Sequence, residues 1–447
     1  MRPSRAYGIS SDVSQEGRSL LARRIPRALR HRDFALLWAG QSVSVAGDGI
    51  FIVAVALEAL RLDHSPTGLS LVLAARIVPA VCLLPIGGAV VDRVPRRLAM
   101  LAGDVGRGVA VGLIALAVAT GTARLWELLA MAVVFGVCDA FFAPASTAII
   151  PELLPTELLV QGSSLTGTSQ QAAQGFIGPA LGGLLAATAG IGAAFAADAA
   201  SFAVSTACLL AMTSRRKPAD PAVTPASSPR RSLLAEVRDG LRYCASRRWL
   251  WMAISSHGFI STVAIMPLFV LVPVLIKQVL GESDAVLGLV LAAGGVGGIA
   301  GAILAGRIPV RGRQVTAMWV SLGAAGATVA GLGGAPNVWY AGLAVAVVWA
   351  FATSGNVLWA PILQEHVPAD MLGRASSIEW TASFAGTPLG LVGAGLLATV
   401  LGVRATMLAG GGLAALTTLG LMVPGVRDPE RAQPAPPAQP PALDQTL

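Results

Sequence analysis

Three ionisable residues lie inside long apolar runs, where a charged group is costly to bury and usually serves a function. Asp48 lies near the middle of the first run, Arg76 lies in the second and Asp139 lies in the fourth. A carboxyl group that pairs with a guanidinium in one conformation and binds a proton in another can couple proton movement to a conformational change. We expect Asp48 and Arg76 to pair across adjacent helices. All three residues are candidates for proton coupling, and a purely structural ion pair is the alternative interpretation.

A second group of charged and aromatic residues surrounds these candidates in the sequence. Asp104 and Arg107 are three residues apart, so they share one face of a helix and can neutralise each other. We therefore predict a structural pair there. Asp139 stands alone in its run and is followed by Phe141 and Phe142, which we predict as the wall of a cavity for an apolar or cationic substrate.

Four more residues in the apolar runs have the chemistry of a site. His257 could relay protons or could be a packing residue, and Trp359 could stack on a substrate or pack against lipid. Asp198 is a lone carboxylate, and we expect Glu379 to be an interfacial charge one turn into its helix. The substrate-cavity candidates are therefore Phe141, Phe142, His257 and Trp359.

The composition identifies the environment of these residues. The chain has 447 residues, of which 54% are hydrophobic and 13% are charged, whereas a soluble domain has about 25% charged residues. This deficit excludes a soluble multidomain enzyme, and the high hydrophobicity excludes a disordered protein. The lipid bilayer is the partner that such a chain requires.

About twelve apolar runs are each long enough to form a membrane-spanning helix, which takes about 20 residues. We predict an all-α integral membrane protein with twelve transmembrane helices in two six-helix bundles, at residues 34–213 and 249–424. Residues 1–33 form a cytoplasmic N-terminal segment and residues 425–447 a flexible cytoplasmic tail. The linker 214–248 ends in an amphipathic helix that we expect to lie on the cytoplasmic face of the membrane.

The charges orient these spans. The net charge of +8 comes mainly from Arg residues in short breaks between the runs, which is the pattern of basic cytoplasmic loops rather than of nucleic-acid binding. Both termini are therefore predicted to be cytoplasmic. The four Cys residues lack metal-ligand spacing, and the sequence contains neither a phosphate-binding loop nor an arrangement of catalytic residues. We predict no enzyme activity, no cofactor and no metal site.

The two halves of the chain contain an internal repeat. Residues 152–159 and 365–372 align without a gap as an acidic and proline-containing segment, and each lies between the fourth and fifth span of its half. Two six-helix halves in the same orientation are the architecture of a transporter that works by rocking. Its substrate site lies between the halves near the middle of the membrane.

The connection after the second span resembles a known loop motif. Gly88, Asp92, Arg93, Arg96 and Arg97 match the Gly-x-x-x-Asp-Arg-x-Gly-Arg-Arg pattern of the major facilitator superfamily, with a proline in place of the second glycine. The resemblance covers roughly residues 30–425. The segment from Arg32 to Asp48 and the Pro-Glu-Leu-Leu-Pro loop at residues 151–155 are similar to the branch that contains the enterobactin exporter and bacterial macrolide efflux proteins.

The fifth span resembles the antiporter motif of the same family. Gly178, Pro179, Gly182 and Gly183 match this motif, although its leading glycine is displaced by one residue.

The resemblance of the loop motif implies that Asp92 is a conformational clamp, which faces the start of the eleventh helix near residues 374–376 in one state.

The resemblance also implies a function. We expect a monomeric, proton-coupled exporter in the bacterial cytoplasmic membrane, whose substrate is a small amphipathic molecule such as a drug, macrolide or siderophore. The alternatives are an importer or uniporter of the same fold, a membrane-embedded enzyme, and the permease subunit of an ATP-driven complex.

Overall fold

The computed structural model describes residues 26–91, 93–213, 233–307, 313–424 and 426. Within these ranges, twelve helical segments are long and apolar enough to cross a membrane. Their windows of highest hydropathy contain at most two acidic or basic residues each. The predicted all-α membrane fold with twelve spans is confirmed.

The first six spans form the N-terminal bundle. The short helix η1 (Arg27–Arg30) precedes them. The spans are α2 (Arg32–Asp63), α3 (Pro66–Val91), α4 (Arg96–Ala119), α5 (Leu125–Ala148) continued by α6 (Ile150–Leu153), the chain of η2 (Thr156–Leu158), α7 (Leu159–Ala172), η3 (Ala173–Ile177) and α8 (Gly178–Ala189), and α9 (Ile191–Ala211).

The last six spans form the C-terminal bundle. The amphipathic helix α10 (Leu233–Ser246) precedes them. The spans are the chain of α11 (Arg248–Ile260), η5 (Ser261–Ile265), α12 (Leu268–Val274) and η6 (Leu275–Val279), then α13 (Asp284–Arg307), α14 (Gln314–Gly333), α15 (Val338–His366), α16 (Ala369–Ala385) with α17 (Thr387–Leu401), and α18 (Val403–Leu416) with η7 (Thr417–Met422).

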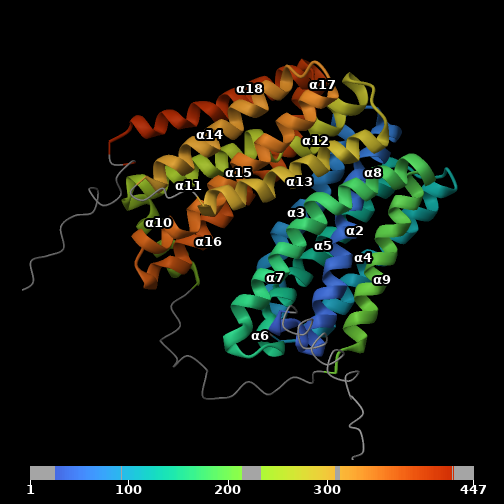
Figure 1. The fold of residues 1–447 in the computed structure, drawn as a ribbon, viewed down its shortest axis with the longest axis horizontal. Helices are drawn as coiled ribbons and strands as arrows, with labels where there is room; N and C mark the ends of the chain where they lie inside the picture. Colours follow the sequence, from blue (N-terminus) through green and yellow to red (C-terminus); the bar gives the residue numbers. More distant parts are fainter. Residues whose placement is uncertain (1–25, 92, 214–232, 308–312, 425, 427–447) are drawn as a thin grey trace, which may run out of the picture.

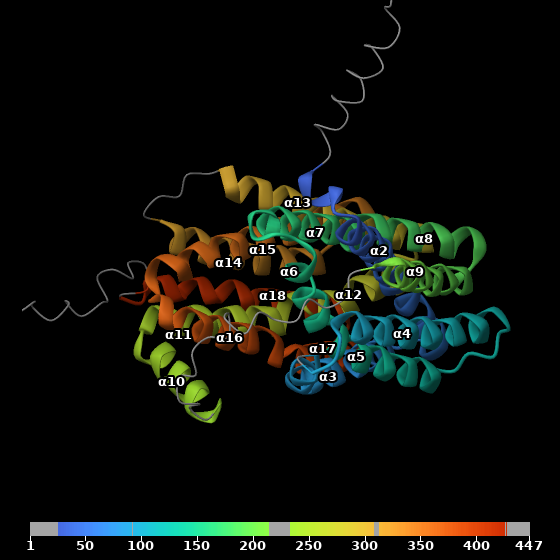
Figure 2. The ribbon, with the colours of Figure 1, turned by 90° about the horizontal axis from the view of Figure 1, so that it is seen from below.

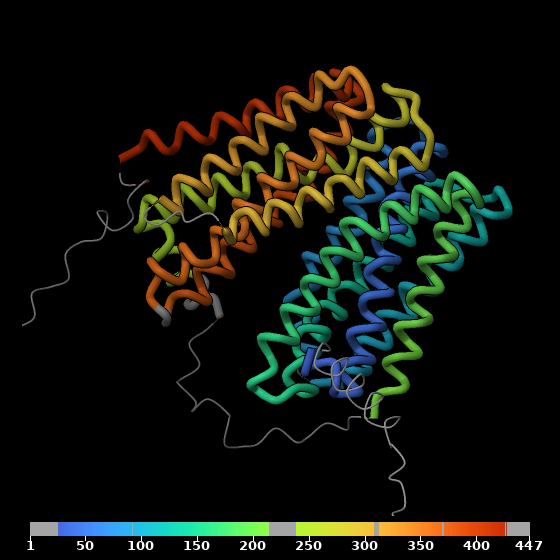
Figure 3. Tube along the Cα trace, viewed as in Figure 1, coloured from blue at the N-terminus to red at the C-terminus, as the bar shows by residue number. Residues whose placement is uncertain are grey.

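The two bundles meet at one end and diverge at the other, so that the molecule has the shape of a V (Figure 1). At the closed end, α2 passes into α3 and α13 begins. At the open end, α4 and α16 begin, and the traces of the two bundles are far apart (Figure 3).

Glycines allow the bundles to touch backbone to backbone at the closed end. The N-terminal helix α8 packs on α13, and a Cβ added to Gly183 would lie 2.7 Å from the Cα of Gly288. A Cβ added to Gly288 would lie 2.5 Å from the carbonyl oxygen of Pro179. Small residues bring membrane helices together in this way because they let the backbones approach closely.

Two hydrogen bonds also join the bundles at the closed end. The hydroxyl groups of Thr67 on α3 and Thr399 on α17 are 2.9 Å apart. The side-chain amide of Gln278 donates to the carbonyl oxygen of His64 at 3.2 Å. These two hydrogen bonds connect α3 to α17 and the end of α2 to η6.

Two spans change from α-helical to π-helical turns near proline residues. In the fifth span η3 comes directly before Gly178 and Pro179, and in the seventh span η5 lies just before Pro267. Proline cannot donate the backbone hydrogen bond of a regular helix, so the adjacent turn widens. Irregular backbone at membrane depth is tolerated where protein covers it or where it borders a cavity.

Two expectations about helices need adjustment. The eleventh span begins at Ala369, earlier than the predicted residues 374–376, because the polar turn after Pro368 already has helical backbone. The amphipathic helix α10 is present, and it packs against α11 and α16 at the edge of the C-terminal bundle (Figure 2). Gly240 makes this packing close, since a Cβ there would lie 2.9 Å from Cδ1 of Ile378.

The contact between α8 and α13 gives a testable prediction. Gly288→Ala places a methyl group against backbone atoms that cannot yield as a side chain can, so it should lower the stability of this conformation by about 1–3 kcal/mol. Thermal unfolding of the purified protein in detergent measures this effect. Gly393→Ala on α17 is the matched control, because its Cβ would meet no atom within 4 Å. Equal unfolding temperatures for the two variants would contradict the proposed close contact.

Candidate functional site

A cluster of six charged side chains lies inside the N-terminal bundle. Four are carboxyl groups and two are guanidinium groups, and five helices supply them. They are Asp48 of α2, Arg76 of α3, Asp104 and Arg107 of α4, Asp139 of α5 and Asp198 of α9. Their formal charges sum to −2 when all six are ionised, so the cluster can hold protons while it stays near neutral.

Arg107 connects the members of this cluster. It donates from Nη2 to Oδ1 of Asp104 at 2.6 Å and from Nη1 to Oδ1 of Asp139 at 3.1 Å. Ser205 of α9 donates to the other oxygen of Asp104 at 2.7 Å. The predicted pair of Asp104 and Arg107 is therefore present, and it is one part of a larger network.

The expected pair of Asp48 and Arg76 does not form. Arg76 instead donates to Oδ2 of Asp139 from Nη2 at 3.1 Å and from Nε at 3.3 Å. The reason is the packing of the helices: α3 lies mainly against α5, not against its sequence neighbour α2. Gly136 of α5 permits this approach, because a Cβ there would overlap the backbone of Arg76.

Asp139 is consequently not a lone carboxylate, because it binds both guanidinium groups of the cluster. The side chains of Arg76 and Asp139 are 21% and 24% exposed, whereas that of Arg107 is 4% exposed. The network thus extends from a buried core at Arg107 to a partly accessible edge at Arg76 and Asp139.

Two carboxyl groups of the cluster have unpartnered oxygens. Among the described residues, Oδ1 of Asp48 and Oδ2 of Asp198 are buried and have no hydrogen-bond partner. Asp198 makes only a long contact of 3.4 Å to the hydroxyl of Ser201 through its other oxygen. Asp48 still interacts electrostatically with Arg107 and Arg76, so it belongs to the cluster without being paired in it.

Aromatic rings cover the guanidinium groups. Arg76 lies 4.1 Å from the ring centre of Phe135, and Arg107 lies 4.1 Å from that of Phe142 and 4.7 Å from that of Phe202. Phe142 thus makes a cation–π contact with Arg107, and its role as a cavity wall stays a prediction. Phe141, its neighbour, is half-buried and is not among the lining residues of the cavities described below.

The C-terminal bundle contains a cavity of about 430 Å³ between α11, η5, α15 and α16. Its lining includes His257, Trp359, Glu379, Trp380, Ser383 and Phe384. The predicted cavity residues His257 and Trp359 are thus brought together here, whereas Phe141 and Phe142 lie in the other bundle.

Glu379 lies deeper in the bundle than the sequence predicts. It is 6% exposed, its Oε1 accepts a hydrogen bond of 3.0 Å from Ser383, and the same oxygen lies 3.4 Å from Nδ1 of His257. The expectation of an interfacial charge was wrong because α16 begins at Ala369, which puts Glu379 about three turns into the helix. The sequence does contain a signal for this depth. Ser383 lies four residues after Glu379, and residues at this spacing face each other on a helix, so a hydrogen bond between them indicates that both lie within the helix.

A second cavity, of about 230 Å³, lies between the two bundles. Its lining includes Ile52, Gln171 and Gln174 from the N-terminal bundle and Phe269 and Trp349 from the C-terminal bundle. Trp349 also lines the cavity of the C-terminal bundle, so the two cavities share a wall. Gln171 and Gln174 were not among the predicted site residues.

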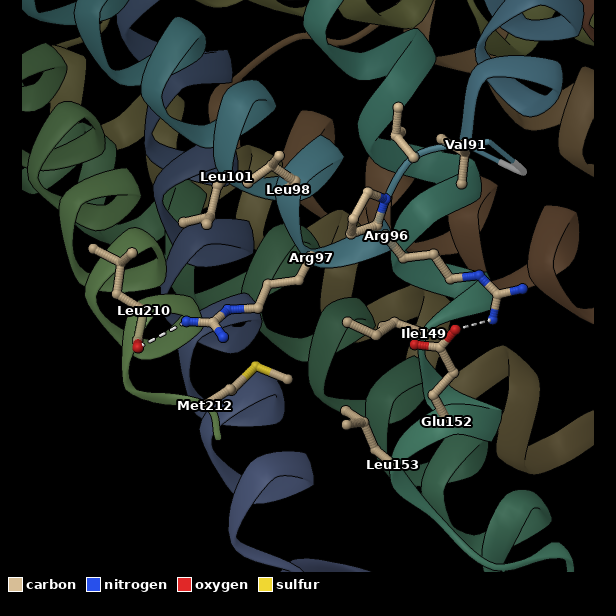
Figure 4. A pocket seen from close by; sticks show the side chains of 12 residues that line it. Val91, Arg96, Arg97, Leu98, Leu101, Ile149, Glu152, Leu153, Leu210 and Met212 are labelled. Atoms are coloured by element: carbon tan, nitrogen blue, oxygen red, sulfur yellow. Dashed lines mark hydrogen bonds and ion pairs between the residues drawn. The ribbon is translucent and has the colours of Figure 1, made fainter. Parts of the chain in front are cut away.

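The loop motif borders a third cavity, of about 380 Å³, at the open end of the N-terminal bundle (Figure 4). Arg96 forms an ion pair of 3.0 Å with Glu152 and donates to the carbonyl oxygen of Ala148, and Arg97 donates to the carbonyl oxygen of Leu210 at 2.8 Å. Arg93 is exposed. In this conformation Arg96 and Arg97 bind within their own bundle.

The other motif residues have different positions. Asp92, the predicted clamp, lies outside the described residues. Gly88 has open space where a Cβ would be, so nothing in its surroundings demands glycine. In the fifth span, Gly178 and Gly182 pack against the backbone of α2, and Gly183 packs against α13. This motif therefore joins the N-terminal bundle to the C-terminal one.

The network around Arg107 gives a stability prediction. Asp104→Ala should lower the stability of the protein by about 3–5 kcal/mol, because it removes one partner of a buried ion pair. Asp284→Ala removes a partner of Lys277 from a pair that is about a quarter exposed, so it should cost about 1 kcal/mol or less. Thermal unfolding of both variants in detergent measures the difference. Equal losses would mean that Arg107 does not depend on Asp104.

Comparisons with known proteins agree with this architecture. The sequence profile of the Major Facilitator Superfamily matches residues 37–382. The chain is 28% identical over 405 residues to the uncharacterized MFS-type transporter YfiS of Bacillus subtilis, covering 86% of this chain and 91% of that protein. It is 27% identical to the multidrug efflux pump Tap of Mycolicibacterium fortuitum, with 84% and 90% covered, and 28% identical to the enterobactin exporter EntS of Shigella boydii, with 89% and 91% covered.

Solved structures share the fold. A bacterial homologue of the lysosomal transporter Spinster, in an inward-facing and unoccupied conformation, superposes with a TM-score of 0.67 at 15% identity and covers 87% of this chain and 96% of that one. A bacterial homologue of the iron transporter ferroportin, in an inward-facing state, gives 0.62 at 17% identity, with 87% and 98% covered. On its profile match, its relatives and its fold, the chain belongs to the major facilitator superfamily.

Proposed function

We propose that this protein is a secondary active transporter that exports a small amphipathic molecule, such as a drug, macrolide or siderophore, across the bacterial cytoplasmic membrane. The exchange is coupled to protons and proceeds by alternating access. The named relatives Tap and EntS support export, and the twelve-helix fold supports alternating access. The observation that carries proton coupling is the unpartnered carboxyl group of Asp48, buried beside a network of two Arg and three other Asp residues.

The orientation follows from the basic residues. Arg93, Arg96 and Arg97 and the arginines of α10 lie at the open end of the V, and basic loops stay in the cytoplasm. With both termini cytoplasmic, the open end faces the cytoplasm and the structure is the inward-facing state. An exported molecule then enters the space between the bundles from the cytoplasm.

The cluster in the N-terminal bundle carries the protons in this scheme. A proton on Asp48 removes one negative charge from a group that the bundle leaves without a partner. When the proton leaves, Arg76 and Arg107 are the cations available to the carboxylate, and Asp139 competes for both. Proton movement thus redistributes the bonds of Arg76 and Asp139 at the accessible edge of the network.

The exchange of states requires opposite changes at the two ends. The closed end opens when the hydrogen bond of Thr67 with Thr399 and that of Gln278 with His64 break. The open end closes when the loop between α3 and α4 meets the start of α16, where unpaired backbone N–H groups favour the negative charge of Asp92. Arg96 is then free to leave Glu152 and take part in this contact.

The proton role predicts a specific loss of coupling. Asp48→Asn should reduce efflux driven by a proton gradient to the background level, because the amide cannot bind a proton in exchange. Uptake of ethidium into inverted membrane vesicles after an imposed proton gradient measures this activity. Asp63→Asn, at the exposed end of the same helix, is the control and should transport normally. Wild-type flux that ignores the gradient would favour a uniporter, and a requirement for ATP and a second protein would favour a permease subunit.

The contact between the bundles predicts a reversible lock. Thr67→Cys with Thr399→Cys, in a chain whose four native cysteines are replaced by serine, should cross-link under oxidation because the hydroxyl groups are already in contact. The cross-link should stop transport in reconstituted vesicles, and a reductant should restore it. The two single-cysteine variants are the controls. Full transport by the cross-linked protein would show that the closed end does not open during the cycle.

A further inference from the structure

The cavity inside the C-terminal bundle differs in its chemistry from the charged cluster of the N-terminal bundle. Its lining contains one carboxyl group, that of Glu379, and one imidazole, that of His257, and otherwise consists of apolar, aromatic and neutral polar side chains. No lysine or arginine is among its lining residues. When Glu379 is ionised and His257 is neutral, the lining has one net negative charge, and an organic cation is the ligand that neutralises it.

Glu379 has room for another partner. Ser383 at 3.0 Å and His257 at 3.4 Å both contact Oε1, and the indole of Trp359 also lies close enough to interact with the carboxyl group. A carboxylate has two oxygens and accepts about four hydrogen bonds. At 6% exposure water reaches it poorly, so an ammonium or another organic cation in the cavity would form a strong interaction with it.

Aromatic side chains also line this cavity. Trp359 is buried beside the cavity, and Trp380 and Phe384 are stacked with ring centres 5.1 Å apart. Trp380 is 62% exposed, so one side of this stack is accessible from outside the bundle. Aromatic faces bind quaternary and other soft cations through the ring quadrupole, and tryptophan does so best.

The size and position of the cavity fit the rest of such a ligand. A volume of about 430 Å³ lies within the range of about 300–1,000 Å³ that is typical of drug-sized ligands. Trp349 separates this cavity from the one between the bundles, where Gln171, Gln174 and Phe269 provide apolar and amide contacts. A charged head at Glu379 therefore leaves space for an aromatic body that reaches toward Trp349.

We infer that Glu379, with Trp359, Trp380 and Phe384, forms a binding site for amphipathic organic cations in the C-terminal bundle. This inference rests on the proposed export function, because it names the substrate class of that exporter. The proton-binding cluster and the substrate-binding carboxyl group are then in different bundles.

A pair of ions with the same shape and opposite charge tests the inference. Tetraphenylphosphonium is a permanent cation, and tetraphenylborate is the matching anion. Equilibrium dialysis of each ion against the purified full chain in detergent, with protein-free micelles subtracted, measures the two affinities without any gradient. The wild type should bind the cation at least about tenfold more tightly than the anion, since one ion-pair contact in a shielded cavity is worth at least that factor.

Substitutions locate the cation. Glu379→Gln should remove this preference, Glu379→Asp should keep it, and Glu365→Gln at the exposed end of α15 should behave as the wild type. Trp380→Ala removes an exposed ring and leaves the core intact, so it should weaken cation binding by about two- to fivefold. If Glu379→Gln does not fold, the cation affinity of Trp380→Ala tests the inference in its place. An unchanged preference in Glu379→Gln, unchanged affinity in Trp380→Ala, or equal binding of both ions by the wild type would overturn the inference.

The same assay separates this inference from the proposed function. Asp48→Asn should keep the preference for the cation over the anion, because this ratio depends on Glu379, although the variant should not exchange the cation for protons. If cation binding depends on Glu379 but the protein shows no proton-driven flux, the proposed function is wrong and the cation site stands. If the protein shows proton-driven flux but cation binding does not depend on Glu379, the cation site is wrong and the proposed function stands.

Discussion

The arrangement of the N-terminal bundle depends on one constraint, which is that Arg107 must be neutralised inside the membrane. Its side chain is 4% exposed, and Asp104 and Asp139 each give it a carboxylate oxygen. To satisfy it, α4 and α5 must pack together at this level, and Asp139 must also bring in Arg76 from α3. Ser205 ties α9 to the same group through Asp104. The position of four helices is therefore fixed by a set of polar contacts that lipid cannot replace.

The two halves share a fold but have diverged in chemistry. The N-terminal bundle contains six charged groups, and aromatic rings cover its two guanidinium groups. The cavity of the C-terminal bundle has one carboxyl group, one imidazole and several tryptophans. The internal repeat is still visible in the acidic and proline-containing segments at residues 152–159 and 365–372. In the first copy Glu152 binds Arg96 of the loop motif, which gives this polar segment a structural reason to persist.

The sequence allowed the spans to be predicted but not the partners of the buried charges. Apolar length determines a crossing helix directly, so the twelve spans follow from hydropathy alone. A partner depends on which helices are adjacent and on how each is rotated. Asp48 and Arg76 are on consecutive spans, yet Gly136 brings α3 against α5 and gives Arg76 to Asp139. Glu379 was misread for a related reason: its depth depends on where α16 begins, and the turn after Pro368 is polar enough to conceal that start.

The proposed proton-binding group and the proposed cation site lie in different bundles, so the proposed mechanism requires the two bundles to move relative to each other. Asp48 of α2 and Glu379 of α16 lie in different bundles, so a proton at one cannot displace a ligand at the other by direct contact. Communication has to pass through the surfaces that the bundles share, and the backbone contacts of Gly183 with Gly288 are among those at the closed end. Such contacts resist a small shift, because backbone atoms in van der Waals contact have no rotamers to adjust. They either hold or separate, and two-state behaviour of this kind lets a change of charge in one bundle alter access to a site in the other.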